Sequence, residues 1–502
     1  MDLRIDRQSA VPIFRQITHQ IREKIVSGEL PAGCLLPPER RLAALLGVNR
    51  TTVLNAYREL KADGLLGGHV GRGTAVLPGR YAEPPAAPAE SFSWRRALRT
   101  GLPRTEDPLV RDVLALTERS DLISLSAGLP SPDHLPIELL RQIQDRVLAH
   151  SGRAALLHSP TEGVTALREA ACRYVGARGI RCEVPEVLVT SGSQQGLDLV
   201  VRTFLDPGDL VVVEEPSYFG AIQVFRNAQI RLLGVPVDSE GMRTDLLEPL
   251  LERWRPKLIY TLPTFQNPSG ALLSAARRRH LLDLAGRFQV PVLEDDPYFD
   301  LRYEGRAVPP LKAMDPGGYV LYLSSFSKVL FPGLRLGLIV GPREALRKLV
   351  LTKQVVDLHS NTLGQWLLAS FLDEGHYEPH LEKVKAAYLE RRDALNRALG
   401  PLGAEGVRWD VPQGGFYLWC RLPEQVSEAR LLAEGARERV AFLPGAPCFA
   451  GEPPAPHIRL NYSCSAPGQL ALGAQGLGRA LRTVLDEAKR RGAPREETPP
   501  LV

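Results

Sequence analysis

Six short apolar runs recur between residues 186 and 341, and longer amphipathic stretches separate several of them. Alternation of strand-like and helix-like segments predicts a mostly parallel β-sheet covered by helices on both faces, a three-layer α/β/α arrangement. Ligands of such sheets bind at the carboxyl ends of the strands, and polar residues follow most of these runs. The runs are EVLVTS (186–191), LVVVEEP (210–216), KLIYTLP (257–263), VPVLEDD (290–296), YVLYLSS (319–325) and LGLIVG (336–341).

The chain has 502 residues, too many for one ordinary domain. A Pro-rich segment over residues 78–108 predicts a semi-rigid linker between an N-terminal domain (1–77) and a second domain (109–489). We assign the second domain a large lobe over about residues 160–341 and a small α+β lobe over about 109–159 and 342–489. Residues 490–502 are predicted to form a flexible tail.

Bulk properties exclude some classes of protein. No run approaches the roughly 20 apolar residues that cross a bilayer, and the charged start does not have the features of a signal peptide. The six cysteines are scattered without zinc-ligand pairing, which predicts reduced thiols, no metal site and a cytoplasmic protein. The net charge is +5, and residues 1–77 carry 11 Lys and Arg against 7 Asp and Glu, which accounts for +4 of it. This basic segment is compatible with nucleic-acid binding or with a solvated surface.

Residues 12–77 have the proportions of a winged helix-turn-helix. Ile13, Ile17, Ile21 and Ile25 form an apolar stripe on a helix over residues 12–27, which ends at the break GELPAG. A helix over residues 39–46 ends at Gly47, and a second begins after Asn49, a residue type that caps helix N-termini. The glycine-rich segment that follows predicts a tight hairpin.

The second of these helices begins with side chains suited to DNA. Arg50, Thr51, Thr52 and Asn55 lie near its N-terminus, the end that enters the major groove in helix-turn-helix proteins. Arg72, between two glycines, would lie on the wing and contact the backbone or the minor groove. The alternative is a small helical cap whose arginines face water.

Residues that could bind a phosphate-bearing cofactor follow the predicted strands. Lys328 comes after the strand 319–325, with Ser325 and Arg335 nearby in sequence, which suits an aldehyde cofactor that bears a phosphate. Ser193 and Gln194 begin a helix after another strand, where free amides bind phosphate. Further candidates are Tyr218 to stack on a flat ring, Asn267 to donate to a phenolic oxygen, Asp295 to pair with a pyridine nitrogen, Tyr298 near it, and Arg459 to bind a carboxylate.

The N-terminal segment closely resembles the N-terminal domain of the GntR regulator family. PIFRQI, GELPAG, LPPERRLAALLGVNRTTVLNAYRELKADG and GRGTAV occur in family order. The resemblance implies that Arg40 and Arg50 are principal DNA contacts and that Thr51 and Thr52 support them.

The segment from LISLSAGLP to HIRLNYS resembles fold-type-I aminotransferases of class I and II. The resemblance implies pyridoxal 5'-phosphate as cofactor, an internal aldimine on Lys328, and Asp295 on the pyridine nitrogen. It further implies ring-oxygen contacts from Asn267 and Tyr298, stacking by Tyr218, phosphate contacts from Ser193, Gln194, Ser325 and Arg335, a ligand carboxylate on Arg459, and Gly128 close to that ligand.

One position departs from this family. Relatives usually carry a tyrosine that reaches the phosphate of the partner subunit, and the segment ALLHSPTEG offers His158 instead. Histidine could donate to phosphate, with a charge that varies near neutral pH, or His158 could be a surface residue.

The combination of both halves resembles the MocR subfamily of GntR regulators, which implies a homodimer that binds operator double-stranded DNA. In this interpretation an amino compound, or pyridoxal phosphate itself, acts as effector through the Lys328 aldimine. The alternative is an active amino-acid aminotransferase with a 2-oxo acid acceptor and an attached DNA-binding module. No membrane partner is expected.

Overall fold

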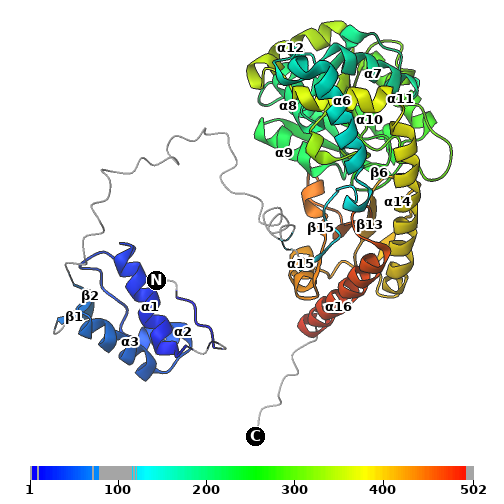
Figure 1. Cartoon of the computed structure of the whole chain (residues 1–502). Helices are drawn as coiled ribbons and strands as arrows, with labels where there is room; N and C mark the ends of the chain where they lie inside the picture. Colours follow the sequence, from blue (N-terminus) through cyan, green and yellow to red (C-terminus); the bar gives the residue numbers. More distant parts are fainter. Residues whose placement is uncertain are drawn as a thin grey trace. The chain divides into compact units, whose positions relative to one another are not determined.

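The computed structural model describes residues 3–69 without 8 and 10, residues 73–77, 116 and 119, and residues 121–492. The chain divides into two compact units, residues 1–99 and 100–502, which are described separately (Figure 1). The predicted linker over residues 78–108 lies outside the described residues. In the described part of the chain, no helix is both long and apolar enough to cross a membrane.

The first unit is the winged helix-turn-helix that the sequence predicts. Helices α1 (Ile13–Val26), α2 (Glu39–Leu46) and α3 (Arg50–Ala62) precede an antiparallel hairpin of β1 (Leu66–His69) and β2 (Gly73–Val76). The predicted isoleucine stripe lies in its core, together with apolar side chains of α2 and α3. Fully or almost fully buried members are Ile17, Ile21, Leu42, Val53, Ala56 and Leu60.

The turn between α2 and α3 follows from its residue types. Gly47 adopts a left-handed conformation (φ 62°), which glycine reaches without steric cost, and it ends α2. The side chain of Asn49 then accepts a hydrogen bond of 3.0 Å from the backbone N–H of Thr51. This bond caps α3 and fixes where the helix begins.

The second unit contains an eight-stranded sheet with the six predicted strands among its members. The sheet is mostly parallel, and β11 runs antiparallel to both of its neighbours. In spatial order the strands are β4 (Val187–Thr190), β11 (Gly337–Val340), β10 (Val320–Ser325), β9 (Val292–Asp295), β8 (Leu258–Thr261), β5 (Leu210–Glu215), β6 (Arg231–Asp238) and β7 (Gly241–Met242). The last two were not predicted.

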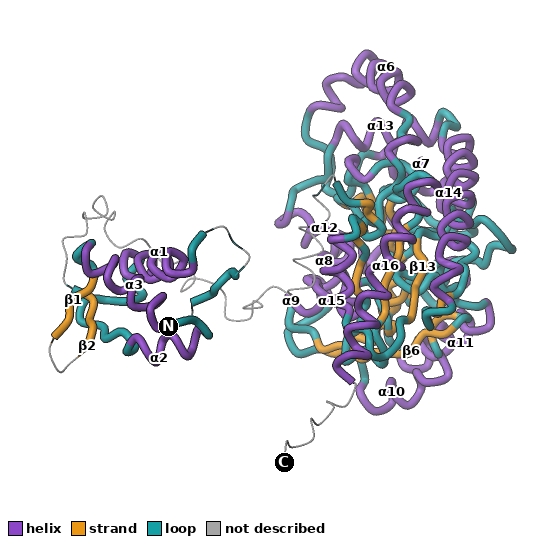
Figure 2. The backbone as a smooth tube through the Cα atoms, turned by 90° about the horizontal axis from the view of Figure 1, so that it is seen from below, coloured by secondary structure: helices purple, strands orange, loops and turns teal. Residues whose placement is uncertain are grey.

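Helices cover both faces of this sheet, as the strand alternation requires (Figure 2). Val211 and Val213 of β5 face one core and Val212 faces the other, because successive side chains of a strand point to opposite faces. One layer contains α8 (Ser193–Phe204), α9 (Phe219–Asn227) and α12 (Arg343–Val356). The other contains α6 (Ile137–Leu156), α7 (Thr165–Gly176), α10 (Leu247–Trp254), α11 (Ala275–Phe288) and α13 (Thr362–Asp373).

A smaller α+β lobe has its own core. Its four-stranded antiparallel sheet has the order β12 (Arg408–Trp409), β13 (Tyr417–Arg421), β16 (His457–Asn461) and β15 (Leu443–Pro444). A short parallel pair joins β3 (Ile123–Ser124) to β14 (Val440–Ala441). Helices α14 (Tyr377–Leu399), α15 (Glu428–Arg437) and α16 (Pro467–Gly492) contribute Leu395, Leu431 and Leu477 to this core.

The boundaries between the lobes differ from those predicted. Ile143 and Val147 of α6 and Leu368 of α13 pack in a core with strand residues of the large sheet. Segments 137–156 and 343–373 therefore belong to the large lobe, although the sequence analysis placed them in the small one. At the other end, α16 continues to Gly492, past the predicted start of the flexible tail, and residues 493–502 lie outside the described residues.

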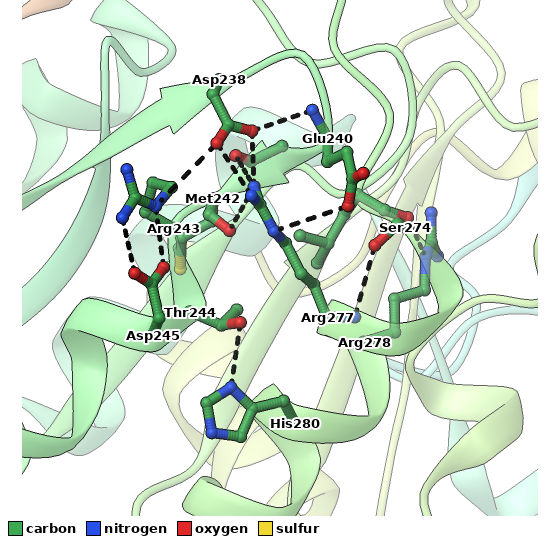
Figure 3. A network of polar contacts seen from close by, with 12 residues as sticks. Asp238, Glu240, Met242, Arg243, Thr244, Asp245, Ser274, Arg277, Arg278 and His280 are labelled. Atoms are coloured by element: carbon green, nitrogen blue, oxygen red, sulfur yellow. Dashed lines mark hydrogen bonds and ion pairs between the residues drawn. The ribbon is translucent and has the colours of Figure 1, made fainter.

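A polar network holds the β7 edge of the large sheet against α11 (Figure 3). Arg277 of α11 forms an ion pair with Asp238 and donates to the carbonyl oxygens of Gly241 and Met242. Arg243 is paired with Asp245. Because these guanidinium groups already have carboxylate partners, we interpret the network as structural.

Candidate functional site

A cavity of about 420 Å³ lies where strand ends of the large sheet meet the small lobe. Its walls contain every residue for which the sequence predicted a cofactor or ligand contact except His158. These residues are Gly128, Ser193, Gln194, Tyr218, Asn267, Asp295, Tyr298, Ser325, Lys328, Arg335 and Arg459. The fold therefore brings together side chains from five strand ends of the large sheet, those of β4, β5, β8, β9 and β10, and one strand of the small lobe, β16.

Lys328 presents an amine inside this cavity. It follows β10, and its Nζ donates a hydrogen bond of 2.7 Å to the carbonyl oxygen of Gly128. Burial, opposed by Tyr417 and assisted by the charge of Arg459, lowers the pKa of Lys328. A lowered pKa leaves more of the amine neutral, the form that attacks a carbonyl carbon.

Asp295 supplies a carboxylate at the end of β9. Its Oδ2 accepts a hydrogen bond of 2.8 Å from the hydroxyl of Tyr260, whereas its Oδ1 is buried with no partner in the described structure. Burial raises the pKa of Asp295 to about 7. A protonated ring nitrogen placed against Oδ1 would satisfy this atom and favour the charged carboxylate.

The start of α8 and the loop after β10 form a seat for an anion. Helix α8 begins at Ser193, directly after Gly192 (φ 83°), so its free backbone amides face the cavity. A Cβ atom on Gly192 would lie 2.8 Å from Nη2 of Arg335, so a larger residue at this positive φ would be strained and would displace the guanidinium. Ser325 and Ser327 add hydroxyls to the same wall.

Arg459 reaches the cavity from β16 of the small lobe. Its Nη1 donates to Oδ1 of Asn267 and its Nη2 to the carbonyl oxygen of Ser126, both at 2.8 Å. Its Nε is buried and has no partner among the described residues. An unpaired buried donor on a cation suits a carboxylate ligand.

Two tyrosines complete the predicted set. The hydroxyl of Tyr218 donates to Oε1 of Gln194 at 3.3 Å, and burial raises the pKa of Tyr218 to about 12. The hydroxyl of Tyr298 donates to that of Tyr417 at 3.1 Å. Burial also raises the pKa of Tyr298 well above its ordinary value, so both hydroxyls stay protonated.

Tyr417 is a wall residue that the sequence analysis missed. It lies in the segment FYLWCRL, and nothing in that segment marks one side chain as facing a ligand. The glycine pair directly before Phe416 was the available signal, because glycines let a backbone approach other groups closely. Ser126, Leu129, Phe219 and Leu443 also line the cavity and were not predicted.

His158 does not line the cavity. Its Nδ1 lies 2.7 Å from Nε2 of His359, and His158 is exposed. The neighbouring Ser360 contacts the hydroxyl of Ser191, whose carbonyl oxygen accepts from Arg335. His158 is thus connected to the anion seat only through several intervening groups.

The predicted DNA contacts of the first unit lie at its surface. Arg40, Arg50, Thr51 and Asn55 are exposed and Thr52 is half-buried. Nη2 of Arg50 lies 3.4 Å from Oε2 of Glu39, so α3 and α2 are joined by an ion pair at this point. Arg72 lies outside the described residues.

Comparisons with known proteins match both units. Residues 14–76 match the bacterial regulatory proteins of the gntR family, and residues 120–475 match aminotransferases of class I and II. An uncharacterized HTH-type transcriptional regulator of Bacillus subtilis, YisV, is 34% identical over 95% of this chain and 98% of its own length. The probable rhizopine catabolism regulatory protein MocR of Rhizobium meliloti is 29% identical over 94% of both chains.

Other relatives match the second unit alone. Aromatic-amino-acid aminotransferase 1 of Thermococcus litoralis is 37% identical over 81% of this chain and 97% of its own length. The crystal structure of LysN, an alpha-aminoadipate aminotransferase from Thermus thermophilus complexed with N-(5'-phosphopyridoxyl)-L-leucine, has a TM-score of 0.74. It is 39% identical and covers 79% of this chain and 100% of its own.

Proposed function

Because the chain belongs to the class I and II aminotransferase family and joins that domain to a gntR-type DNA-binding domain, we propose that it is a regulator that binds pyridoxal 5'-phosphate and responds to an amino compound. Its regulatory character rests on the first unit, and relatives named as regulators match over both units. The observation that carries the ligand part of the proposal is the buried, unpaired Oδ1 of Asp295 in the same cavity as Lys328.

Pyridoxal phosphate fits the groups that line the cavity. Bound there, it would supply an aldehyde for a primary amine and a ring that accepts electrons. Asp295 would hold the protonated ring nitrogen and Asn267 would donate to the ring oxygen. Tyr298 would lie beside that oxygen, with its own hydroxyl hydrogen donated to Tyr417. The amides at the start of α8, the hydroxyls of Ser193 and Ser325, and Arg335 would hold the phosphate. Tyr218 would pack on the ring.

The effector would occupy the space between Lys328 and Arg459. The hydrogen bond from the free Lys328 amine to the carbonyl oxygen of Gly128 joins the large lobe to the segment after β3. Attachment of the cofactor to this amine would remove the bond, and an amino compound that replaces the lysine on the cofactor would free the amine to form it again. Formation or loss of that bond would couple ligand binding to the relative position of the two lobes. A change in DNA affinity follows only if the ligand binds one arrangement more tightly than the other, since equal affinity shifts no equilibrium.

On the DNA side, α3 would enter the major groove of operator DNA. The exposed Arg50, Thr51 and Asn55 lie in its first turns and would contact base edges and phosphates. Arg40 on α2 would contact the backbone.

We also propose a homodimer. Leu156 and Leu157 precede His158, and Val355 and Leu358 precede His359, which contacts it; all four apolar side chains are exposed. The side chain of Val355 is 86% exposed. An apolar patch of this kind is typical of an interface, and a second copy of the chain would cover it.

A specific observation also favours a second function, transamination. Lys328, Asp295 and Arg459 all line one cavity, and aminotransferases are among the relatives of the second unit. Transfer of an amino group to 2-oxoglutarate by the purified protein would support an active enzyme that carries a DNA-binding module.

The regulator proposal is tested by an electrophoretic mobility shift with DNA from upstream of its own gene. The protein loaded with pyridoxal phosphate should retard this DNA more than an unrelated fragment, and an effective amino compound should change the apparent Kd. Lys328→Ala should lose the absorption band of the bound cofactor and the response to the amino compound. Failure to retard the DNA under all conditions, or an unchanged band in Lys328→Ala, would contradict the proposal.

A further inference from the structure

Tyr417 lines the cavity together with Lys328 and Arg459. It is buried, at the start of β13, and its ring packs against the guanidinium of Arg459, whose Cζ lies 4.1 Å from the ring centroid. A cation over an aromatic face is attracted by the negative charge of that face. The ring of Tyr417 therefore helps fix the orientation of Arg459.

The hydroxyl of Tyr417 is held in a definite place. Tyr298 donates a hydrogen bond of 3.1 Å to it. A Cβ atom on Gly128 would lie only 2.0 Å from the Tyr417 oxygen, so this hydroxyl uses space that only a glycine leaves open. Lys328 donates a hydrogen bond to the carbonyl oxygen of the same glycine. The Tyr417 hydroxyl and the Lys328 amine therefore both lie next to Gly128.

Two donors in this region remain available for a ligand. Tyr298 donates to the oxygen of Tyr417, which leaves the hydrogen of Tyr417 free to be donated elsewhere. Nε of Arg459 is buried without a partner in the described structure. Both residues line the cavity, on the side where Lys328 presents its amine.

We propose that Tyr417 is a specificity-determining residue that restricts the ligand to compounds with a carboxylate beside the primary amine. The inference rests on the proposed function and refines it. Nε of Arg459 binds one carboxylate oxygen, the hydroxyl of Tyr417 donates to the other, and the amine of the same compound lies toward Lys328.

The electrostatics of the residue support this role. Burial acts to raise the pKa of Tyr417, but the charges of Arg459 and Lys328, with the bond from Tyr298, bring it below its ordinary value. A more acidic hydroxyl is a stronger hydrogen-bond donor to an anion. A simple amine without a carboxylate would leave both donors unpaired in a desolvated pocket. Because unpaired buried donors are costly, such an amine should bind much more weakly than the amino acid.

The test compares amino acids with the amines that lack only the carboxylate. Full-length protein loaded with pyridoxal phosphate is titrated with L-alanine and ethylamine, L-leucine and 3-methylbutylamine, and L-phenylalanine and 2-phenylethylamine, followed by absorbance. The amino acid that binds most tightly is chosen, together with its matching amine. The Kd of the amine divided by the Kd of the amino acid then measures how strongly the site selects for the carboxylate. Tyr417→Phe keeps the ring on Arg459 and removes only the hydroxyl.

We expect this ratio to exceed one in the wild type and to fall about tenfold in Tyr417→Phe, the effect of one hydrogen bond to a charged group. Tyr462→Phe is the matched control, because its buried hydroxyl donates to Gly414 in the same lobe and does not line the cavity. Uptake of pyridoxal phosphate should remain similar in both variants.

A second pair of variants tests the geometry. Gly128→Ala in the wild-type background should lower the ratio, because the new Cβ displaces the Tyr417 hydroxyl. In the Tyr417→Phe background the same substitution should lower the ratio by less. Independent sites would instead show additive effects. A wild-type ratio of one, an unchanged ratio in Tyr417→Phe, an equal fall in Tyr462→Phe or strictly additive effects would overturn the inference. Absence of a Lys328-dependent absorption band in the wild type would overturn the proposed function itself.

Discussion

Asp295 illustrates how a single buried group ties cofactor binding to pH. Burial raises its pKa to about 7, far above that of an unfolded aspartate, so the apoprotein is stabilised by the protonated form. This contribution is fully present below about pH 4, the ordinary aspartate value, and is lost as the pH rises through 7. A bound ring that carries a proton on its nitrogen would reverse the preference.

We therefore predict that pyridoxal phosphate raises the melting temperature more at pH 8 than at pH 6. In Asp295→Asn this pH dependence should largely disappear and the affinity for the cofactor should fall at least about tenfold, measured by fluorescence titration of the apoprotein. Glu428→Gln is the control, since Glu428 is also a buried carboxylate with a raised pKa but does not line the cavity. A pH-independent stabilisation in the wild type would show that Asp295 does not hold the ring nitrogen.

At the scale of elements, the start of α8 is predicted to hold the phosphate. Gly192→Ala introduces a Cβ at positive φ that meets the Arg335 guanidinium. We expect the affinity for pyridoxal phosphate to fall about tenfold or more and that for pyridoxal, which lacks the phosphate, to change little. Gly208→Ala is matched, because Gly208 also has positive φ (95°) but its Cβ would meet nothing within 4 Å. Equal losses for both ligands would place the phosphate elsewhere.

Helix α3 carries the prediction for DNA. Arg50→Ala should weaken binding to the specific site by about 1–3 kcal/mol, the value of a good base contact, and leave cofactor uptake unchanged. Arg58→Ala removes the same charge from an exposed position further along α3 and should cost less. The measurement is a mobility-shift titration at fixed salt concentration, since affinities for DNA depend on salt. Equal losses in both variants would argue for a general charge effect.

The elements of the large sheet show how far sequence reasoning reaches. Six strands were predicted because each is a short apolar run, most of them followed by polar residues, and all six lie in the sheet. Strand β6 was missed because its side chains are mostly half-buried, so its apolar run is broken by exposed positions. Helix α6 was assigned to the wrong lobe. Its amphipathic stripe shows that one face of the helix is buried, but it does not show which sheet or helix covers that face.

Prediction of the pocket succeeded and failed for related reasons. Lys328, Asp295 and the residues after β4 and β8 could be grouped in advance, because parallel strand ends converge. Tyr417 could not, since its place depends on the antiparallel register in which it faces Asn461 and on a glycine far away in the chain. Their roles as cofactor contacts stay predictions until the experiments above are done.

At the scale of the whole molecule, we predict a dimer of twice 55.2 kDa in sedimentation velocity. Val355→Glu should shift the equilibrium toward the monomer, because a charge in an apolar interface is costly. Leu472→Glu serves as control, since Leu472 is exposed on α16 of the small lobe, away from this patch. A monomer in the wild type, or equal dissociation in both variants, would count against the proposed interface.

The hydrogen bond from Arg459 to Asn267 prepares the ligand site before any ligand arrives. In the ligand-free protein, Nη1 of this guanidinium, which comes from the small lobe, already donates to an acceptor on the large lobe, whereas Nε has no partner among the described residues. A carboxylate that binds at Nε leaves the contact with Asn267 intact, so the cation that receives it is already oriented. Preorganisation of this kind lowers the entropic cost of binding, and it depends on the two lobes keeping the spacing that this bond records.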